Sequence, residues 1–185
     1  FRYDLFEKMR KAQAEASDSP LSDFFAFAPI YEVTAVTNNQ AEVINGQAVS
    51  GSYYAGLGVT PMLGRAINDA DDKPGSPPVV VLSHQYWQES FGANAGVVGQ
   101  QLKINDTSFT IIGVAPPGFT GTLQVDQRPA VTIPISFEPA LLGKGTGMAT
   151  ADRPHIWWLG LMGRLKPGAT LEQARESLNG TFQSA

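Results

Sequence analysis

The chain has 185 residues and a formal net charge of −4, and only 16% of its residues are charged. It is long enough to bury a core without cross-links, but it has no concentration of Lys and Arg that could displace counterions, so we exclude nucleic acid as a partner. It has no cysteine, which excludes disulfide scaffolds, thiol nucleophiles and iron–sulfur sites, and no apolar run approaches the roughly 18 residues of a membrane span.

The N-terminal part predicts one helix and two strands. Apolar residues recur at helical spacing over residues 1–17, which predicts a helix. Residues 24–36 are rich in aromatic and β-branched side chains and predict extended structure, which we expect Pro29 to break. Residues 41–49 predict a further strand.

The middle of the chain predicts short elements separated by turns. Residues 49–65 hold four glycines and a proline and predict a short helix or a turn. The continuous apolar run at 79–82 predicts a strand buried on both faces. A short helix follows, with Ser83 as its N-cap and Gly92 closing it, and then a hairpin is expected to turn at Asn105 and Asp106.

The C-terminal part predicts two strands, a loop and a helix. Residues 130–135 predict a short strand, residues 143–154 a mobile loop, and residues 155–165 a strong strand. Thr170 caps the last helix, with Gln173 three residues later. The apolar face of that helix is expected to hold Leu171, Ala174, Leu178 and Phe182.

This order of elements predicts an α+β fold in which the two terminal helices lie side by side. Helical patterns run to both ends of the sequence. We therefore expect the chain to be a piece of a longer polypeptide.

The glycine-rich stretches do not match a nucleotide-binding loop. A dinucleotide site needs G-x-G-x-x-G between a strand and a long helix, but the third glycine is missing after Gly56 and Gly58, and Pro61 follows. We instead expect Gly58 and Gly64 to supply backbone angles that other residues adopt poorly. Residues 143–146 have the composition of a phosphate loop without its order.

The acidic segment 68–72 does not match a calcium loop either, because Lys73 replaces a ligand and the glycine falls late. We interpret the segment as a solvated acidic loop. Arg65 precedes it and could bind an anion, but such an arginine more often ties a turn by donating to backbone carbonyls or to nearby acidic side chains.

The two histidines share no motif. Ser83 and His84 are neighbours at a helix start, which points their side chains apart, and His155 lies far along the chain. The sequence therefore predicts no catalytic, cofactor-binding or metal-binding residue and no enzyme activity. In the predicted strand 155–165, one of Trp157 and Trp158 should face outward, where it could contact a partner.

Three segments together resemble the periplasmic core domain of MacB-type ABC transporter permeases. They are "VSGSYYAGLGVTPMLGRAINDADD" at 49–72, "VVVLSHQYWQESFGANAGVVGQQLKINDTSFTIIGVAPPGF" at 79–119, and "LMGRLKPGATLEQARESLN" at 161–179. Their order and spacing match that family. In Trp87, in the spacing of Gly92 and Gly99 and in "RLKPG", the chain resembles most the acidobacterial-type duplicated orphan permeases, which lack a fused ATPase domain.

The resemblance implies a two-lobed domain. One lobe would combine residues 1–45 and 150–185, with βαβ-like strand–helix units near the membrane, and the other would be a mixed α/β lobe over 46–149. The domain would lie outside the inner membrane, between transmembrane helices beyond both ends of the sequence. It would do no chemistry and would relay motion from ATP hydrolysis. Its implied partners are a second permease copy or domain, a separate cytoplasmic ATPase and a periplasmic adaptor.

Two other functions remain open. One is a ligand-binding or sensor domain with a cleft between its lobes, which predicts a closed pocket lined by aromatic side chains. The other is a hydrolase with an unrecognised site, which predicts titratable groups that converge. If the chain is instead a permease domain, its two ends should lie close together.

Overall fold

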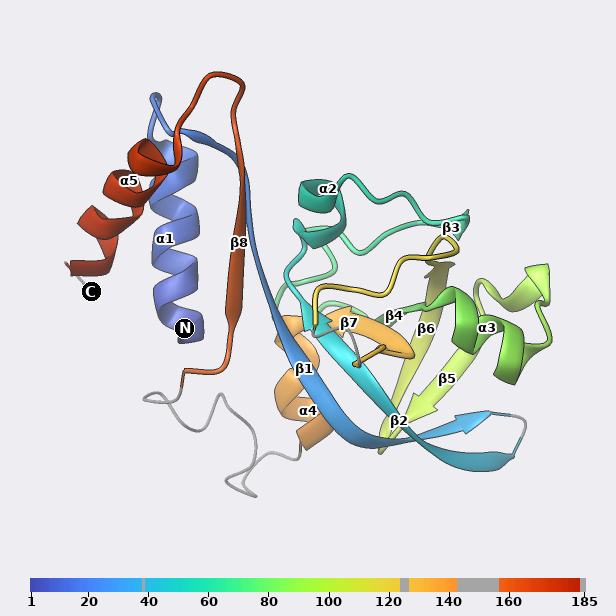
Figure 1. The fold of residues 1–185 in the computed structure, drawn as a ribbon. Helices are drawn as coiled ribbons and strands as arrows, with labels where there is room; N and C mark the ends of the chain where they lie inside the picture. Colours follow the sequence, from blue (N-terminus) through green and yellow to red (C-terminus); the bar gives the residue numbers. More distant parts are fainter. Residues whose placement is uncertain (38, 124–126, 143–156, 184–185) are drawn as a thin grey trace.

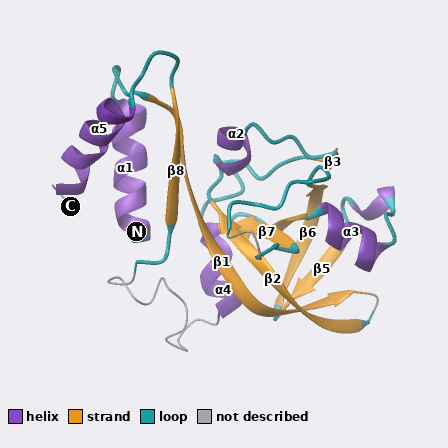
Figure 2. Ribbon diagram, viewed as in Figure 1, coloured by secondary structure: helices purple, strands orange, loops and turns teal. Residues whose placement is uncertain are grey.

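The computed structural model describes residues 1–37, 39–123, 127–142 and 157–183, and its mixed α+β fold confirms the predicted class (Figure 1). Figure 2 separates the helices from the strands. The helices are α1 (Tyr3–Glu15), α2 (Tyr53–Leu57), α3 (His84–Phe91), α4 (Glu138–Leu142) and α5 (Leu171–Gln183), with 3-10 turns η1 (Ala95–Val97) and η2 (Ile135–Phe137). The strands are β1 (Leu21–Thr37), β2 (Gln40–Val49), β3 (Leu63–Gly64), β4 (Val79–Leu82), β5 (Gln101–Ile104), β6 (Thr107–Val114), β7 (Val131–Pro134) and β8 (Gly160–Leu165).

Most of the strands close into a barrel. The pairing runs β1–β2–β7–β4–β6–β5 and returns to β1, because β1 pairs with both β2 and β5. The β2–β7 and β4–β6 pairs are parallel and the other pairs in the ring are antiparallel. Closure leaves these strands without a free edge. We call this ring of six strands the barrel; β3 adds to β6 outside it, and β8 adds to β1.

The barrel interior is apolar, and each of its strands contributes buried side chains to it. Strand β4 is buried on both faces, as its continuous apolar run predicted. Val80 and Leu82 join the main core inside the barrel, whereas Val79 and Val81 join a second core that lies under α2. The second core also takes in Tyr53 of α2.

Strand β1 is longer than the sequence predicted. It runs for 17 residues without interruption at Pro29, which stays in register opposite Gln47 of β2. The irregularity lies instead between Ile30 and Val33, where Glu32 has a φ of 53°. A proline is tolerated in a strand where its missing N–H is not needed for the ladder, so the predicted break is wrong.

A second group of elements lies beside the barrel, and we call it the terminal unit: α1, α5, β8 and residues 21–27 of β1. Figure 1 shows α1 and α5 side by side along β8, and Gln13 Nε2 of α1 donates to Ser177 Oγ of α5 over 2.9 Å. The predicted neighbourhood of the terminal helices is therefore confirmed. The predicted βαβ-like units are wrong, because β1 and β8 are antiparallel and a βαβ unit requires parallel strands.

Two further predictions for this unit need correction. Strand β8 begins at Gly160, so Trp157 and Trp158 precede it rather than lie within it. Leu171 is 79% exposed, because it occupies the first turn of α5, beyond the part of the helix that packs on α1. Ala174 and Leu178 do face the core, as predicted.

The turn and cap predictions hold. Ser83 Oγ accepts the N–H of Tyr86 at 3.1 Å. Gly92 closes α3 with a φ of 58°, and Asn105 turns the β5–β6 hairpin with a φ of 50°. The loop predicted at 143–154 lies outside the described residues.

Candidate functional site

The two ends of the described chain meet in a cluster of aromatic rings. The ring of Phe1 stacks on Trp157 with centroids 5.5 Å apart, and its edge contact with Phe182 spans 6.2 Å. Trp157 is 62% exposed, so one of the two adjacent tryptophans does face outward as predicted. A permease domain was predicted to have chain ends that lie close together. The contact between Phe1 and Phe182 shows that the two described ends are close.

Strand β1 belongs to both the terminal unit and the barrel. Its first part pairs with β8 and its second part with β2. Phe27 lies where the two ladders overlap, opposite Val49 of β2 and Gly160 of β8. The terminal helices and the barrel are therefore joined by one continuous strand.

Helix α2 packs into the angle between the terminal unit and the barrel. Its Tyr53 ring meets Phe25 of β1 edge-on at 5.6 Å. A Cβ atom on Gly56 would lie 2.4 Å from the Phe25 ring, so only glycine allows this approach. The adjoining Ser52 Oγ donates to the carbonyl of Phe24 at 3.1 Å, and Arg164 Nε of β8 donates to the carbonyl of Gly56 at 2.9 Å.

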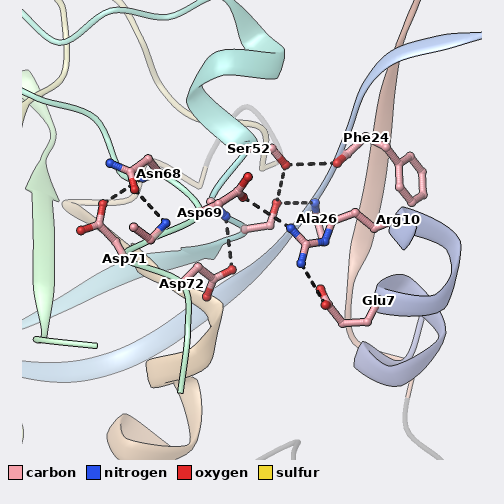
Figure 3. Close-up of polar contacts among 12 residues, drawn as sticks. Glu7, Arg10, Phe24, Ala26, Ser52, Asn68, Asp69, Asp71 and Asp72 are labelled. Carbon is pink, nitrogen blue, oxygen red and sulfur yellow. Dashed lines mark hydrogen bonds and ion pairs between the residues drawn. The ribbon is translucent and has the colours of Figure 1, made fainter. Parts of the chain in front are cut away.

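A charged contact also crosses from α1 to the barrel side (Figure 3). Arg10 lies between two carboxylates, with one nitrogen 2.9 Å from Glu7 of its own helix and the other 3.4 Å from Asp69. An open cleft of about 280 Å³ lies beside this contact, lined by residues of α1, β1, Ser52 and Asp69. No sequence pattern indicates this contact, because its partners lie 59 residues apart.

The segment that carries Asp69 is fixed to the barrel by its neighbours. Arg65 forms two hydrogen bonds with Asp71, at 2.6 and 2.8 Å, which confirms that this arginine ties a turn. Asp72 accepts the N–H groups of Gly51 and Ser136 on its two oxygens, at 3.2 and 2.9 Å. These contacts join three separate segments of the chain.

The two aspartates have opposite pKa shifts. Burial acts to raise the pKa of Asp71, but the hydrogen bonds from Arg65 and from the Asn68 N–H outweigh it, and the pKa is lowered. Burial raises the pKa of Asp72 to about 6, against the hydrogen bonds that it accepts from Ser136 and Gly51. The prediction of a solvated acidic loop is therefore wrong for these residues: Asp71 is only 8% exposed.

The residues considered for chemistry are not brought together. Ser83 Oγ caps its own helix, and the ring of His84 lies 5.6 Å from Trp87. An open groove of about 420 Å³ passes this helix start, with Arg128 and Asn45 among its lining residues. His155 and the 143–146 stretch lie outside the described residues. Within the part of the chain that is described, no group of His, Asp and Glu side chains could hold a metal ion.

Across the described ranges, no helix combines the length and the apolar character needed to cross a bilayer. The contacts between the terminal unit and the barrel side are hydrogen bonds, an ion pair and close aromatic packing.

The profile of the family described as "MacB-like periplasmic core domain" matches residues 3–181. The chain belongs to this family. The MacB-like periplasmic core domain is a periplasmic or extracellular part of ABC-type permeases, a family not known to be catalytic. Membership in an ABC-type permease implies ATPase partners in general. The family match does not support the more specific resemblance to the acidobacterial-type permeases.

Solved structures share the fold. The periplasmic region of MacB from Actinobacillus actinomycetemcomitans matches with a TM-score of 0.69 at 20% identity, over 96% of this chain and 72% of that one. The extracellular domain of the ABC-type transporter YknZ from Gram-positive bacteria matches at 0.65 and 13% identity, over 96% and 78%. A domain of a permease protein from Porphyromonas gingivalis matches at 0.64 and 16% identity, over 95% and 68%. No curated protein sequence matches the chain.

Proposed function

We propose that this MacB-like domain transmits conformational change between membrane helices and partner subunits, without catalysing a reaction. The observation that carries the proposal is the continuity of β1, whose 17 residues serve both the terminal unit and the barrel. A displacement of the terminal helices would be passed along this strand to the barrel, because moving one part alone would break its ladder.

The contacts around α2 support movement as one body. Ser52 and Gly56 bond to β1 and β8, Phe25 packs on Tyr53, and Arg10 reaches Asp69. Closely packed cores resist small continuous deformation. A push on α1 or α5 would then move the barrel as a lever rather than bend the junction.

We also propose the two-lobed division, with a revised border. From Ala28 onward, the paired residues of β1 bond to β2 and β5 within the barrel, so we place the border near Phe27 rather than at residue 45. The membrane-proximal lobe would hold residues 1–27 and 157–183. The partners we propose are a second permease copy, a separate ATPase in the cytoplasm and a periplasmic adaptor, with the permease in the inner membrane.

The proposal is tested by restraining the barrels. Lys103 is exposed on β5, and the domain contains no native cysteine, so a Lys103→Cys substitution gives one reactive thiol in this domain. In the full-length permease assembled with its ATPase, a bifunctional reagent that joins the barrels of two copies should slow ATP hydrolysis. A reductant that cleaves the reagent should restore it. Unchanged hydrolysis after efficient cross-linking would contradict the proposal; a monofunctional reagent is the control.

A ligand-binding role is a second candidate. It predicted a closed pocket lined by aromatic side chains, whereas the grooves of about 420 and 280 Å³ that could hold a ligand are open. The larger groove has Arg128, His84 and Asn45 in its wall, which could contact an acidic small molecule. Native mass spectrometry of the domain isolated from its host would then show a reproducible added mass, which should disappear in Arg128→Ala. A domain that carries no added mass would count against this role.

A further inference from the structure

Asp72 lies at the contact between α1 and the barrel side, and it is held from the barrel side. Its two oxygens accept the N–H groups of Gly51 and Ser136, at 3.2 and 2.9 Å. Both donors belong to the backbone, so their positions do not depend on the rotation of a side chain. A small movement of α1 would therefore leave the carboxyl group of Asp72 in place.

Asp72 also faces residues of α1. Burial, followed by the negative charges of Asp72 and Glu7, raises the pKa of Tyr3 to about 12. The charge of Glu7 in turn adds to the larger effect of burial in raising the pKa of Asp72. Figure 3 shows Glu7 and Arg10 on α1 opposite Asp69 and Asp72. The carboxyl group of Asp72 thus joins the barrel side to the electrostatics of the terminal unit.

Negative charge exceeds positive charge at this contact. Glu7, Asp69 and Asp72 bring three carboxyl groups to it, and Arg10 already contacts Glu7 and Asp69. An ionised Asp72 adds a like charge opposite Glu7 at a largely buried position, where solvent screens it weakly. A protonated Asp72 avoids both this repulsion and the cost of burying a charge. The proton therefore favours the contact with α1.

The other charged groups near Asp72 do not offset its charge through an ion pair. Arg65 is bound to Asp71, Lys73 is exposed, and Glu138 is a further acidic residue two positions after Ser136. Within the described ranges, the ion pairs do not include Asp72.

We propose that protonation of Asp72 fastens α1 to the barrel side, and that loss of this proton loosens the contact. Solvent supplies the proton, and it reaches one side of the contact through the open cleft of about 280 Å³ beside Arg10 and Asp69. The pKa of Asp72 is about 6 with α1 in place, and it should fall toward the ordinary 3.8 when α1 moves away and water hydrates the carboxylate. By linkage, α1 is held most firmly below about pH 4 and less firmly as the pH rises through about 6.

The family is periplasmic or extracellular, so this contact meets the pH outside the inner membrane. A looser junction would pass less motion from the terminal helices to the barrel at higher pH. That consequence rests on the proposed function, whereas the pH response of the contact does not.

The test is the distribution of distances between spin labels on Lys8→Cys of α1 and Lys103→Cys of β5, two exposed positions. It is measured in the full-length permease without ATP, with labelled copies diluted among unlabelled ones. Raising the pH from 4 to 7 should broaden or lengthen the distribution. The ratio of loose to tight copies should rise by up to about 100-fold, as a pKa difference of about two units allows. Identical distributions at the two pH values would overturn the proposal.

Two variants assign the response to Asp72. Asp72→Asn carries no charge at either pH, so its distribution should not change between them; a response that persists in this variant would overturn the proposal. Glu7→Gln removes the facing charge and keeps an oxygen that can accept from Arg10. It should reduce the response and leave the contact tighter at pH 7 than in the native chain. If Glu7 only supported Arg10, Glu7→Gln would loosen the contact at both pH values, which would contradict the proposal.

The matched control is Asp4→Asn, which removes an exposed carboxylate from the same helix. It should respond to pH as the native chain does, and loss of the response in this variant would show a general effect of charge and overturn the proposal. Because ATP is absent, the outcome does not depend on whether joining the barrels slows ATP hydrolysis. The two proposals therefore fail separately.

Discussion

The backbones of Gly51 and Asp69 lie in direct contact where the α2 region meets the 65–72 segment. A Cβ atom on Gly51 would come within 2.4 Å of the Asp69 Cα atom and 2.5 Å of its nitrogen. The same approach lets the Gly51 N–H reach Asp72. One glycine thus permits both the hydrogen bond to Asp72 and the position of Asp69 opposite Arg10.

Gly51→Ala should therefore lower the stability of the domain. The methyl group meets backbone atoms, which cannot move aside as a side chain can, and we expect a loss of about 1–3 kcal/mol in the free energy of unfolding. Urea unfolding measures it. The matched control is Gly180→Ala in α5, where a Cβ atom meets nothing within 4 Å and alanine favours the helix. Equal stability of Gly51→Ala and the native chain would contradict the close contact.

Arg65→Met should destabilise the 65–72 segment. It leaves the mostly buried carboxylate of Asp71 without its two charged donors, and we expect a loss of about 1–2 kcal/mol because Arg65 itself is half exposed. Arg65→Lys should recover only part of this, since an ammonium cannot donate in a bidentate fork. Thermal unfolding measures both, with the exposed Lys11→Met as the control. A loss as small as that of the control would show that the pair contributes nothing.

Asp72 should give the domain a pH dependence of unusual sign. Its pKa is about 6 in the fold against an ordinary value of 3.8 for an aspartate, so between pH 4 and 6 the folded chain binds more protons than the unfolded chain. The contribution of Asp72 to stability is therefore greatest at low pH and falls as the pH rises through this window, by up to about 3 kcal/mol. Unfolding curves of the native chain and Asp72→Asn from pH 4 to 7 measure this difference.

The matched contrast is Asp71→Asn, because the lowered pKa of Asp71 gives the opposite sign. Its contribution is nearly constant from pH 4 to 7, which lies above its unfolded pKa, and is lost only as the pH falls below that range. A stability difference between the native chain and Asp72→Asn that rises with pH would show that the shift of Asp72 has the wrong direction.

Thr170→Ala should loosen the start of α5. Thr170 Oγ1 accepts the N–H of Gln173 at 3.2 Å, and Gln173 Oε1 accepts the N–H of Thr170 at 2.9 Å. Loss of this reciprocal cap typically costs about 0.5–2 kcal/mol. Amide exchange in the first turn should accelerate in Thr170→Ala and stay near native in Thr170→Ser. An unchanged rate in Thr170→Ala would show that the cap does not hold the helix.

Local rules predicted the local features of this fold. The cap at Ser83, the turn at Asn105 and the two-sided burial of residues 79–82 follow from residue types a few positions apart. The aromatic and β-branched composition likewise predicted extended structure at β1, although Pro29 was wrongly expected to end it.

The features that depend on distant partners were not predictable in this way. Closure of the barrel requires β1 to pair with both β2 and β5, and nothing in the residues of β1 specifies two partners. Asp72 looked like part of a solvated loop, because its bond to Ser136 spans 64 residues. The Arg10–Asp69 contact has the same origin. The expected function came from the resemblance to a family, because no pattern of reactive residues indicated one.

The most direct test of the lever proposal is a pair of spin-label distances in the full-length permease assembled with its ATPase. One pair joins Lys103→Cys in two copies, and the other joins Lys8→Cys on α1 to Lys103→Cys within one copy; both sites are exposed. The lever proposal predicts that ATP shifts the distance between copies while the distance within a copy stays the same. An internal distance that changes while the barrels of the two copies stay fixed would contradict it.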